Sequence, residues 1–284
     1  FLFILTPRSH AKSIQIHRNQ ILISIMSAPQ SPKVKSRSSF ETFTTLKEKL
    51  SNNQQLYFTR FGDGEVIAMM GKDHRNYQTS AGLVEELKES FTIDHPNYLM
   101  ALSINFPYEK KMAPGMFAPF TRNDYLLDFL ANNDLLVKNT YENPFLFHYL
   151  TVFYSRQMFD FFETYIRPKR KMFIGSTPRD VAERLYGTIH HYIQIPAKHA
   201  YNSIDSWWPH VENNINDVEL VIPSAGAASN VISKRLWNMN AQVHLLDIGS
   251  IVDAIEGKHS RIWVRIQGHK IKKILPKDQR NGLY

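Results

Sequence analysis

Cysteine is the residue that this sequence lacks altogether. None of the 284 positions holds one, and this excludes disulfide bridges, zinc sites built from thiolates and enzymes with a cysteine nucleophile. A chain without disulfides fits a reducing compartment, and we therefore expect a cytoplasmic protein.

Long hydrophobic runs are also lacking. "FLFILTP" and "ILISIM", near the start, are far shorter than the roughly 20 apolar residues of a membrane span, so we expect no transmembrane segment. Met26 then opens a stretch rich in Pro, Ser and Lys, a composition typical of flexible segments. We expect residues 1–37 to be a flexible basic extension with Met26 as the true start; the alternatives are an ordered arm or a cleaved signal segment.

Acidic residues are missing from one end of the chain and scarce at the other. Six Lys or Arg and no acid precede Glu41, and eight Lys or Arg with a single acid follow Gly257. The formal charge of +8 therefore lies at the ends, while the part between them holds 20 basic and 25 acidic residues, a net of −5. An acidic body makes nucleic acid an unlikely partner.

Short apolar runs alternate with amphipathic stretches along the rest of the chain. A capping-box spacing between Ser38 and Glu41 marks where folded structure starts. The alternation predicts an α/β fold with a mainly parallel sheet covered by helices on both faces. We expect one domain at 38–268 and a basic tail at 269–284. The predicted strands are 55–60, 98–104, 171–176, 191–196, 218–224 and 242–249, and the predicted helices are 40–50, 81–91, 122–133, 144–166, 177–187 and 227–240.

Four of the predicted strands end in polar or glycine-bearing turns: "RFGDGE", "IGSTPRD", "PSAGAAS" and "LDIGS". Because ligands of parallel sheets bind beyond the carboxyl ends of the strands, these turns should converge on one cleft. The glycines of "LDIGS" are too few for the cofactor loop of a methyltransferase, so we disfavour that class.

The turn "RFGDGE" carries two carboxylates beside an arginine. Asp63 and Glu65 offer the hard oxygen ligands that Mg²⁺ and Mn²⁺ prefer, and Gly62 leaves room for a ligand. Arg60 could bind a phosphate through its planar guanidinium. The alternative is an acidic turn in which Glu65 stabilises a helix N-terminus.

Two further turns lead from a strand into a predicted helix. Thr177 and Pro178 have the residue types of an N-cap and first helical position, so Gly175 and Ser176 come just before a helix N-terminus, which favours anions. Ser224 and Gly226 repeat this arrangement. Either turn could hold a diphosphate, or both are ordinary connections built from small residues.

The stretch "YNSIDSWW" combines amide, carboxylate and indole groups. Asn202, Asp205, Trp207 and Trp208 form a mixture found where sugars stack on aromatic rings. The alternative is that the tryptophans begin a helix of the hydrophobic core.

Taken together, "TRFGDGE", "YQTS", "FYSR", "AKHAYNSIDSW" and "LLDIG" resemble, in this order, the glycosyltransferases of the GT-D fold with a D-x-E motif. The resemblance implies a Rossmann-like fold, a nucleoside-diphosphate sugar donor, typically a UDP-sugar, and a divalent metal, Mn²⁺ or Mg²⁺, on Asp63 and Glu65. Within "YQTS" we assign Gln78 to the donor site. Family members often have histidine after "DIG", whereas this chain has Ser250 there, so no role of that histidine is transferred.

The expected function is transfer of a sugar from a nucleoside-diphosphate donor to a hydroxyl of a glycan or glycoprotein. An inverting reaction needs a general base, and Asp205 and Asp253 are the candidates. The alternative is a non-catalytic α/β protein that binds nucleic acid or an anionic surface through its basic ends.

Overall fold

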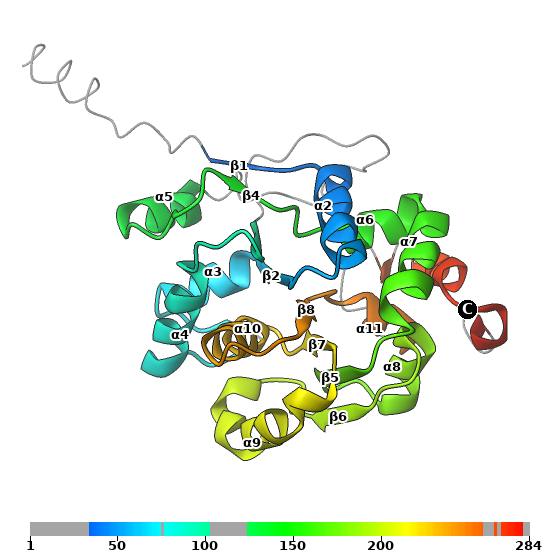
Figure 1. Ribbon diagram of the computed structural model, residues 1–284. Coiled ribbons are helices and arrows are strands. Elements are labelled where there is room, and N and C mark those ends of the chain that lie inside the picture. Colours follow the sequence, from blue (N-terminus) through cyan, green and yellow to red (C-terminus); the bar gives the residue numbers. More distant parts are fainter. Residues whose placement is uncertain (1–33, 75–76, 103–123, 258–263, 266–267, 281–284) are drawn as a thin grey trace, which may run out of the picture. The chain divides into compact units, whose positions relative to one another are not determined.

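Six parallel strands form the central sheet, in the order β3-β2-β8-β7-β5-β6 (Figure 1). The structure is a computed structural model, and it describes residues 34–74, 77–102, 124–257, 264–265 and 268–280. Every strand pair runs parallel, as the alternation of strands and helices predicts. The strands are β3 (Tyr98–Leu102), β2 (Tyr57–Phe61), β8 (His244–Leu246), β7 (Leu220–Ser224), β5 (Lys171–Gly175) and β6 (His191–Gln194).

Alternate side chains of the strands enter two separate hydrophobic clusters, because successive residues of a strand point to opposite faces. Tyr57 and Phe61 of β2 belong to one cluster, and Phe58 between them belongs to the other. Both faces of the sheet are therefore buried under helices, which confirms the predicted α/β architecture.

The helices divide between the two faces according to the cluster that their apolar side chains join. One face is covered by α3 (Asp63–Met69), α4 (Ala81–Phe91), α5 (Asp124–Asn132), α9 (Ile204–Asn214) and α10 (Ala228–Asn238). The other is covered by α2 (Ser39–Ser51), α6 (Leu146–Phe153), α7 (Ser155–Phe161), the π-helical turn η2 (Phe162–Ile166), α8 (Arg179–Tyr186), α11 (Ile251–Ile255) and the 3₁₀ helix η5 (Gly268–Ile274).

Helix ends follow the sequence signals in one place and depart from them in two. Ser38 caps α2 in a full capping box with Glu41, as predicted. The predicted helix 144–166 is instead interrupted at Tyr154, whose φ of −137° and ψ of 43° are not helical. Helix α8 has Pro178 rather than Thr177 at its N-cap. The apolar spacing continues across Tyr154, so periodicity alone could not locate this break.

The ends of the compact unit differ from the predicted boundaries. It starts at Val34, and β1 (Lys35–Ser36) pairs with β4 (Thr140–Tyr141), so residues 34–37 belong to the fold. The expected tail from 269 onward packs through Ile271, Ile274 and Leu275, which are fully buried. Residues 1–33 and 281–284 lie outside the described residues. Over the described parts of the chain, no helix has the length and apolar character needed to cross a membrane.

Candidate active site

Four adjacent strands carry the four polar turns that the sequence singles out. Strands β2, β8, β7 and β5 are neighbours in the sheet order, and parallel strands place their carboxyl ends at the same edge. Gly175 and Ser224 are direct partners in the register of β5 and β7. The sheet therefore brings "RFGDGE", "LDIGS", "PSAGAAS" and "IGSTPRD" to one edge.

The acidic turn after β2 is the first turn of a helix. Gly62 is the N-cap of α3, which begins at Asp63. Its backbone N–H donates to Glu65 Oε2 over 2.8 Å, and the N–H of Gly64 donates to Asp63 Oδ1 over 3.0 Å. The stabilised helix N-terminus, one of the two alternatives for this turn, is thus present. It does not exclude a ligand, because Asp63 is exposed and Glu65 only partly buried.

The charge balance at this turn disfavours the ionised form of Glu65. Burial raises the pKa of its carboxyl group, and the carboxylate of Asp247 raises it further, while the hydrogen bond from Gly62 and the guanidinium of Arg60 act in the opposite direction. A cation placed against Glu65 would favour its ionised form. The turn therefore has the electrostatics of a site that gains from positive charge.

Arg60 and Asp247 join the ends of β2 and β8. Nη2 of Arg60 donates to Asp247 Oδ1 over 2.9 Å, and Nη1 donates to the carbonyl of Pro144 over 3.2 Å. Gly249, at φ 75°, lies so close that a side chain there would overlap the guanidinium. Arg60 is expected from sequence to meet a phosphate, yet in the structure its guanidinium is already bound to a carboxylate.

Two residues that the sequence analysis missed lie over the acidic turn. A β-carbon at Gly64 would overlap the hydroxyl of Tyr77 and lie 3.5 Å from the ring of His74. The two rings pack on each other with centroids 4.8 Å apart. Glycine at position 64 is thus needed for the approach of Tyr77. Nothing in the spacing of these residues indicates this contact, although "YQTS" includes Tyr77.

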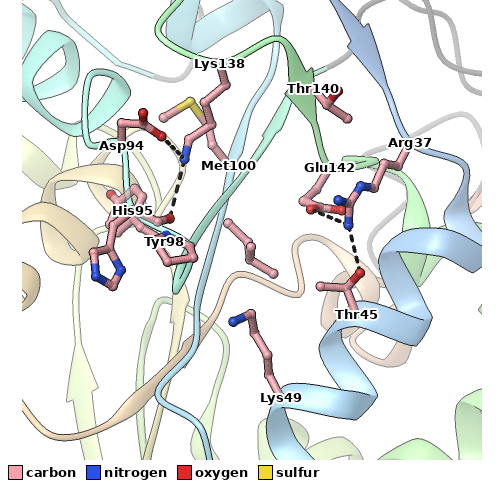
Figure 2. A pocket seen from close by; sticks show the side chains of 12 residues that line it. Arg37, Thr45, Lys49, Asp94, His95, Tyr98, Met100, Lys138, Thr140 and Glu142 are labelled. Atoms are coloured by element: carbon pink, nitrogen blue, oxygen red, sulfur yellow. Dashed lines mark hydrogen bonds and ion pairs between the residues drawn. The ribbon is translucent and has the colours of Figure 1, made fainter.

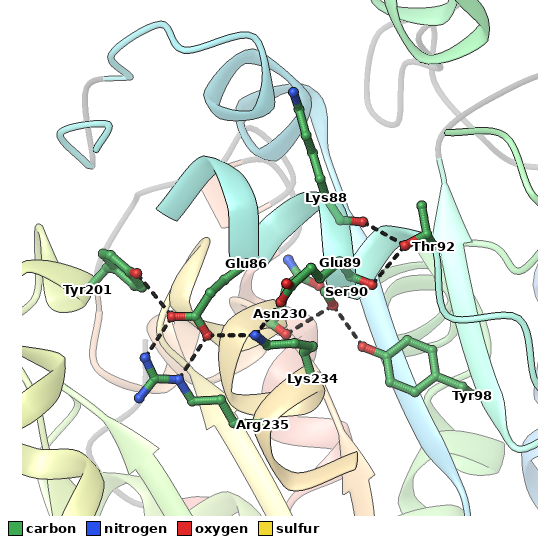
Figure 3. A network of polar contacts seen from close by, with 10 residues as sticks. All are labelled: Glu86, Lys88, Glu89, Ser90, Thr92, Tyr98, Tyr201, Asn230, Lys234 and Arg235. Atoms are coloured by element: carbon green, nitrogen blue, oxygen red, sulfur yellow. Dashed lines mark hydrogen bonds and ion pairs between the residues drawn. The ribbon is translucent and has the colours of Figure 1, made fainter. Parts of the chain in front are cut away.

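The segment after β6 folds back onto α4 and the residues before it. His199 Nδ1 accepts the backbone N–H of Gln78 over 2.8 Å, and Tyr201 donates to Glu86 Oε1 over 3.0 Å. Figure 3 shows Glu86 also between Lys234 and Arg235 of α10. This network brings "YQTS" next to "AKHAYNSIDSW". Gln78, Asn202 and Asp205 are exposed along this junction.

The two tryptophans lie in the core, which corrects the expectation of an acceptor platform. Trp207 is 4% exposed and Trp208 7%. Their indole N–H groups donate to the carbonyl of Ala200 and to Glu212 Oε1, and the guanidinium of Arg235 lies over the Trp208 ring. Rings covered in this way have no free face for a sugar, because helix α9 turns them toward the sheet.

The remaining predicted donor residues occupy the turns after β5 and β7. Gly175 is buried against Phe173 and Ser224, while Ser176 and Ser224 are half-buried. Gly226 is exposed and has a φ of 57°, a conformation that favours glycine. These positions lie at the carboxyl ends of β7 and β5, the two strands that follow β8 in the sheet order, and their role in binding stays a prediction.

Comparison with protein families decides between an enzyme and a binding protein. The sequence profile described as "Glycosyltransferase GT-D fold" matches residues 58–270. The chain belongs to this family. As a GT-D glycosyltransferase it is an enzyme rather than a non-catalytic protein that binds through its basic ends, and the family assignment expected from the sequence is confirmed.

Solved structures share the fold. A glycosyltransferase from Streptococcus sanguinis, of the group called domain of unknown function 1792, is 16% identical with a TM-score of 0.58, over 79% of this chain and 84% of that one. Two further structures of domain 1792, one described as having a distinct glycosyltransferase fold, are 17% identical with TM-scores of 0.57, over 80% of this chain and 81% of theirs. Comparison with curated proteins gives no match.

The side chains around Asp63 and Glu65 show which metal ligands this GT-D enzyme can offer to a divalent ion. The described residues contain no group of three or more histidine or carboxylate side chains that could hold a metal ion. Magnesium is commonly held by one or two protein carboxylates, with substrate phosphates supplying further oxygens. Asp63 and Glu65 supply two carboxylates of the kind that such an ion takes, and Oε2 of Glu65 already accepts the N–H of Gly62.

Ser250, in the turn after β8, lies beside a histidine of helix α6. Oγ of Ser250 lies 3.4 Å from Nε2 of His148, a buried residue of α6. Asp253 follows in the first turn of α11 and is partly buried. Beneath them the fully buried phenol of Tyr186 has its pKa raised by burial and, to a lesser degree, by Asp247 and Asp253. Of the two candidate bases, Asp253 is thus the one whose charge, like that of Asp247, acts on this phenol.

Proposed function

We propose that this glycosyltransferase moves a sugar from a nucleoside-diphosphate donor, a UDP-sugar, to a hydroxyl of a glycan or glycoprotein, with a divalent metal held by Asp63 and Glu65. The observation that carries the proposal is the pair of carboxylates at the carboxyl end of β2, the first in a row of four adjacent polar strand ends. When bound, the metal, Mn²⁺ or Mg²⁺, neutralises charge on the leaving diphosphate.

The donor site is built around a fixed turn. Arg60 holds Asp247 beside Glu65, so this arginine positions the acidic turn rather than binding phosphate directly. The donor then extends along this edge from the metal at α3 toward the turns of Gly175, Ser176, Ser224 and Gly226, where hydroxyls and backbone N–H groups donate to it. Gln78, next to His199, takes a part of the donor on the other side of the turn.

The acceptor site lies on the exposed polar residues of the same edge. Asp253 is our choice of general base for an inverting reaction, because it lies in the first turn of the helix that follows β8, and its charge, like that of Asp247, acts on Tyr186. Asp205 is the second choice, since it is exposed in the first turn of α9, just after the segment that His199 joins to Gln78. Asn202 would hold an acceptor hydroxyl. The absence of cysteine supports a reducing compartment, and we propose the cytoplasm.

A screen of nucleotide sugars tests the proposal. We expect one UDP-sugar to release UDP slowly in water and faster with the right acceptor, in both cases only with Mn²⁺ or Mg²⁺. Excess EDTA should stop the release, and restored metal should recover it. Glu85 of α4 is exposed, so Glu85→Gln is a control for charge loss elsewhere. Turnover that continues in EDTA would refute the metal, and the absence of turnover with every nucleotide sugar would refute the donor class.

A further inference from the structure

A cavity of about 460 Å³ lies beside the outer strand of the sheet, away from the four polar strand ends. It is bounded by the start of β3 and the residues before it, by α2, and by the segment around β4. Figure 2 shows side chains from these three parts of the chain around it. Its volume is within the range of pockets that bind small molecules.

Three cationic side chains from distant parts of the sequence line this cavity: Arg37, Lys49 and Lys138. Arg37 pairs with Glu142 over 3.4 Å, and Lys138 pairs with Asp94 over 3.0 Å. The two acids therefore balance two of the three cations. Lys49 is the third, and it leaves the lining with a surplus positive charge.

Lys49 is held in place by a neutral group. Its ammonium donates to Asn97 Oδ1 over 2.8 Å, and the described residues give it no carboxylate within ion-pair distance. The side chain is half-buried. An ammonium that lines a cavity, held by a neutral group and without a carboxylate partner among the described residues, is thus suited to an anion from outside the chain.

The rest of the lining fits an organic anion rather than a bare ion. Leu99 is half-buried on the strand side and Pro96 adds a second apolar surface, while Met100, which also borders the cavity, is buried in the core. Thr45 and Thr140 supply hydroxyl groups. We propose that this cavity is a second binding site of the enzyme, which takes a small organic ligand through its phosphate or carboxylate group. Lys49 binds the anionic group, Lys138 and Arg37 neutralise the two acids that would otherwise repel it, and the apolar side holds the carbon skeleton.

Saturable binding of defined probes tests the site without reference to catalysis. The probes are glucose 6-phosphate, glucuronate and, as the neutral analogue, glucose, at constant ionic strength. We expect the two anions to raise the melting temperature in a saturable way, because a ligand that binds only the folded state stabilises it; glucose should not. Stronger stabilisation by one anion assigns the site to a phosphate or to a carboxylate.

Matched lysine variants on one helix locate the binding. Lys49→Gln should abolish the saturable shift, and Lys138→Gln should weaken it. Lys47 is an exposed residue of the same helix α2 outside the cavity, and Lys47→Gln should behave as wild type. Amide NMR shifts of the unmodified protein should change on titration around residues 94–100 and 138–142. No saturable shift with either anion, equal shifts in Lys49→Gln and Lys47→Gln, or shift changes only at the polar strand ends would each overturn the proposal.

Discussion

Arg60 and Asp247 are separated by 187 positions in the sequence and form an ion pair of 2.9 Å between the ends of β2 and β8. The pair joins the two segments, "TRFGDGE" and "LLDIG", that mark the ends of the sequence resemblance. It forms because β8, the last strand of the sheet to be reached by the chain, inserts beside β2, the first. The acidic turn is thereby fixed against the centre of the sheet.

Breaking this pair should cost both stability and activity. Arg60→Gln leaves the carboxylate of Asp247, whose side chain is 9% exposed, without its partner. Loss of one member of a buried pair typically costs about 3–5 kcal/mol, and we expect the lower end because Arg60 is 19% exposed. Chemical denaturation measures this. The double variant Arg60→Gln/Asp247→Asn should recover part of the stability but little transfer activity. Full activity in the double variant would contradict a positioning role.

The contact between Gly64 and Tyr77 predicts a pairwise effect. Gly64→Ala introduces a β-carbon where the hydroxyl of Tyr77 lies, and forced overpacking costs about 1–3 kcal/mol. Tyr77→Phe removes the overlapping oxygen, so the double variant should be more stable than Gly64→Ala alone. A double-mutant cycle on melting temperature and donor hydrolysis measures the coupling. Additive effects would show that the two residues do not meet.

The core position of the two tryptophans leads to a prediction about stability. Trp207→Ala and Trp208→Ala should each lower the free energy of unfolding by about 3–5 kcal/mol, because a large buried ring leaves a cavity. Asn202→Ala, at an exposed position, should leave stability unchanged. Denaturant titration measures both. At temperatures where the folded state persists, Trp208→Phe should have the acceptor KM of the wild type. A raised KM without loss of stability would restore the stacking interpretation.

Much of the fold is readable from local pattern, and the site only in part. All six strands of the sheet coincide with short apolar runs, since a strand buried on both faces needs no alternation. The order of the strands is a property of packing, so the Arg60–Asp247 pair has no local signal. The contact of Tyr77 with Gly64 likewise has no local signal in the sequence. The tryptophans of α9 lie in an amphipathic stretch whose pattern is compatible with an exposed or a buried position. Only the packing of α9 shows that they are buried.

Buried His244 should make stability fall in mild acid. Burial, together with nearby Lys169, lowers its pKa from 6.5 to about 4. The unfolded chain therefore binds the proton more readily, and stability is lost as the pH falls from about 6.5 toward 4, by up to about 3 kcal/mol. His244→Gln should flatten this part of the stability curve, whereas His210→Gln, at an exposed position, should not. Equal curves for wild type and His244→Gln would contradict the assignment.

The central claim is that Glu65 and Asp63 hold the metal on which donor turnover depends. The most direct measurement is the rate of UDP release from the active nucleotide sugar as Mn²⁺ is titrated, in wild type, Glu65→Gln, Asp63→Asn and the control Glu85→Gln. Wild type and control should show the same saturable activation, and both site variants should lose at least about 10²-fold in rate while keeping the wild-type melting temperature within a few degrees. Unchanged Mn²⁺ activation in either site variant would contradict the account.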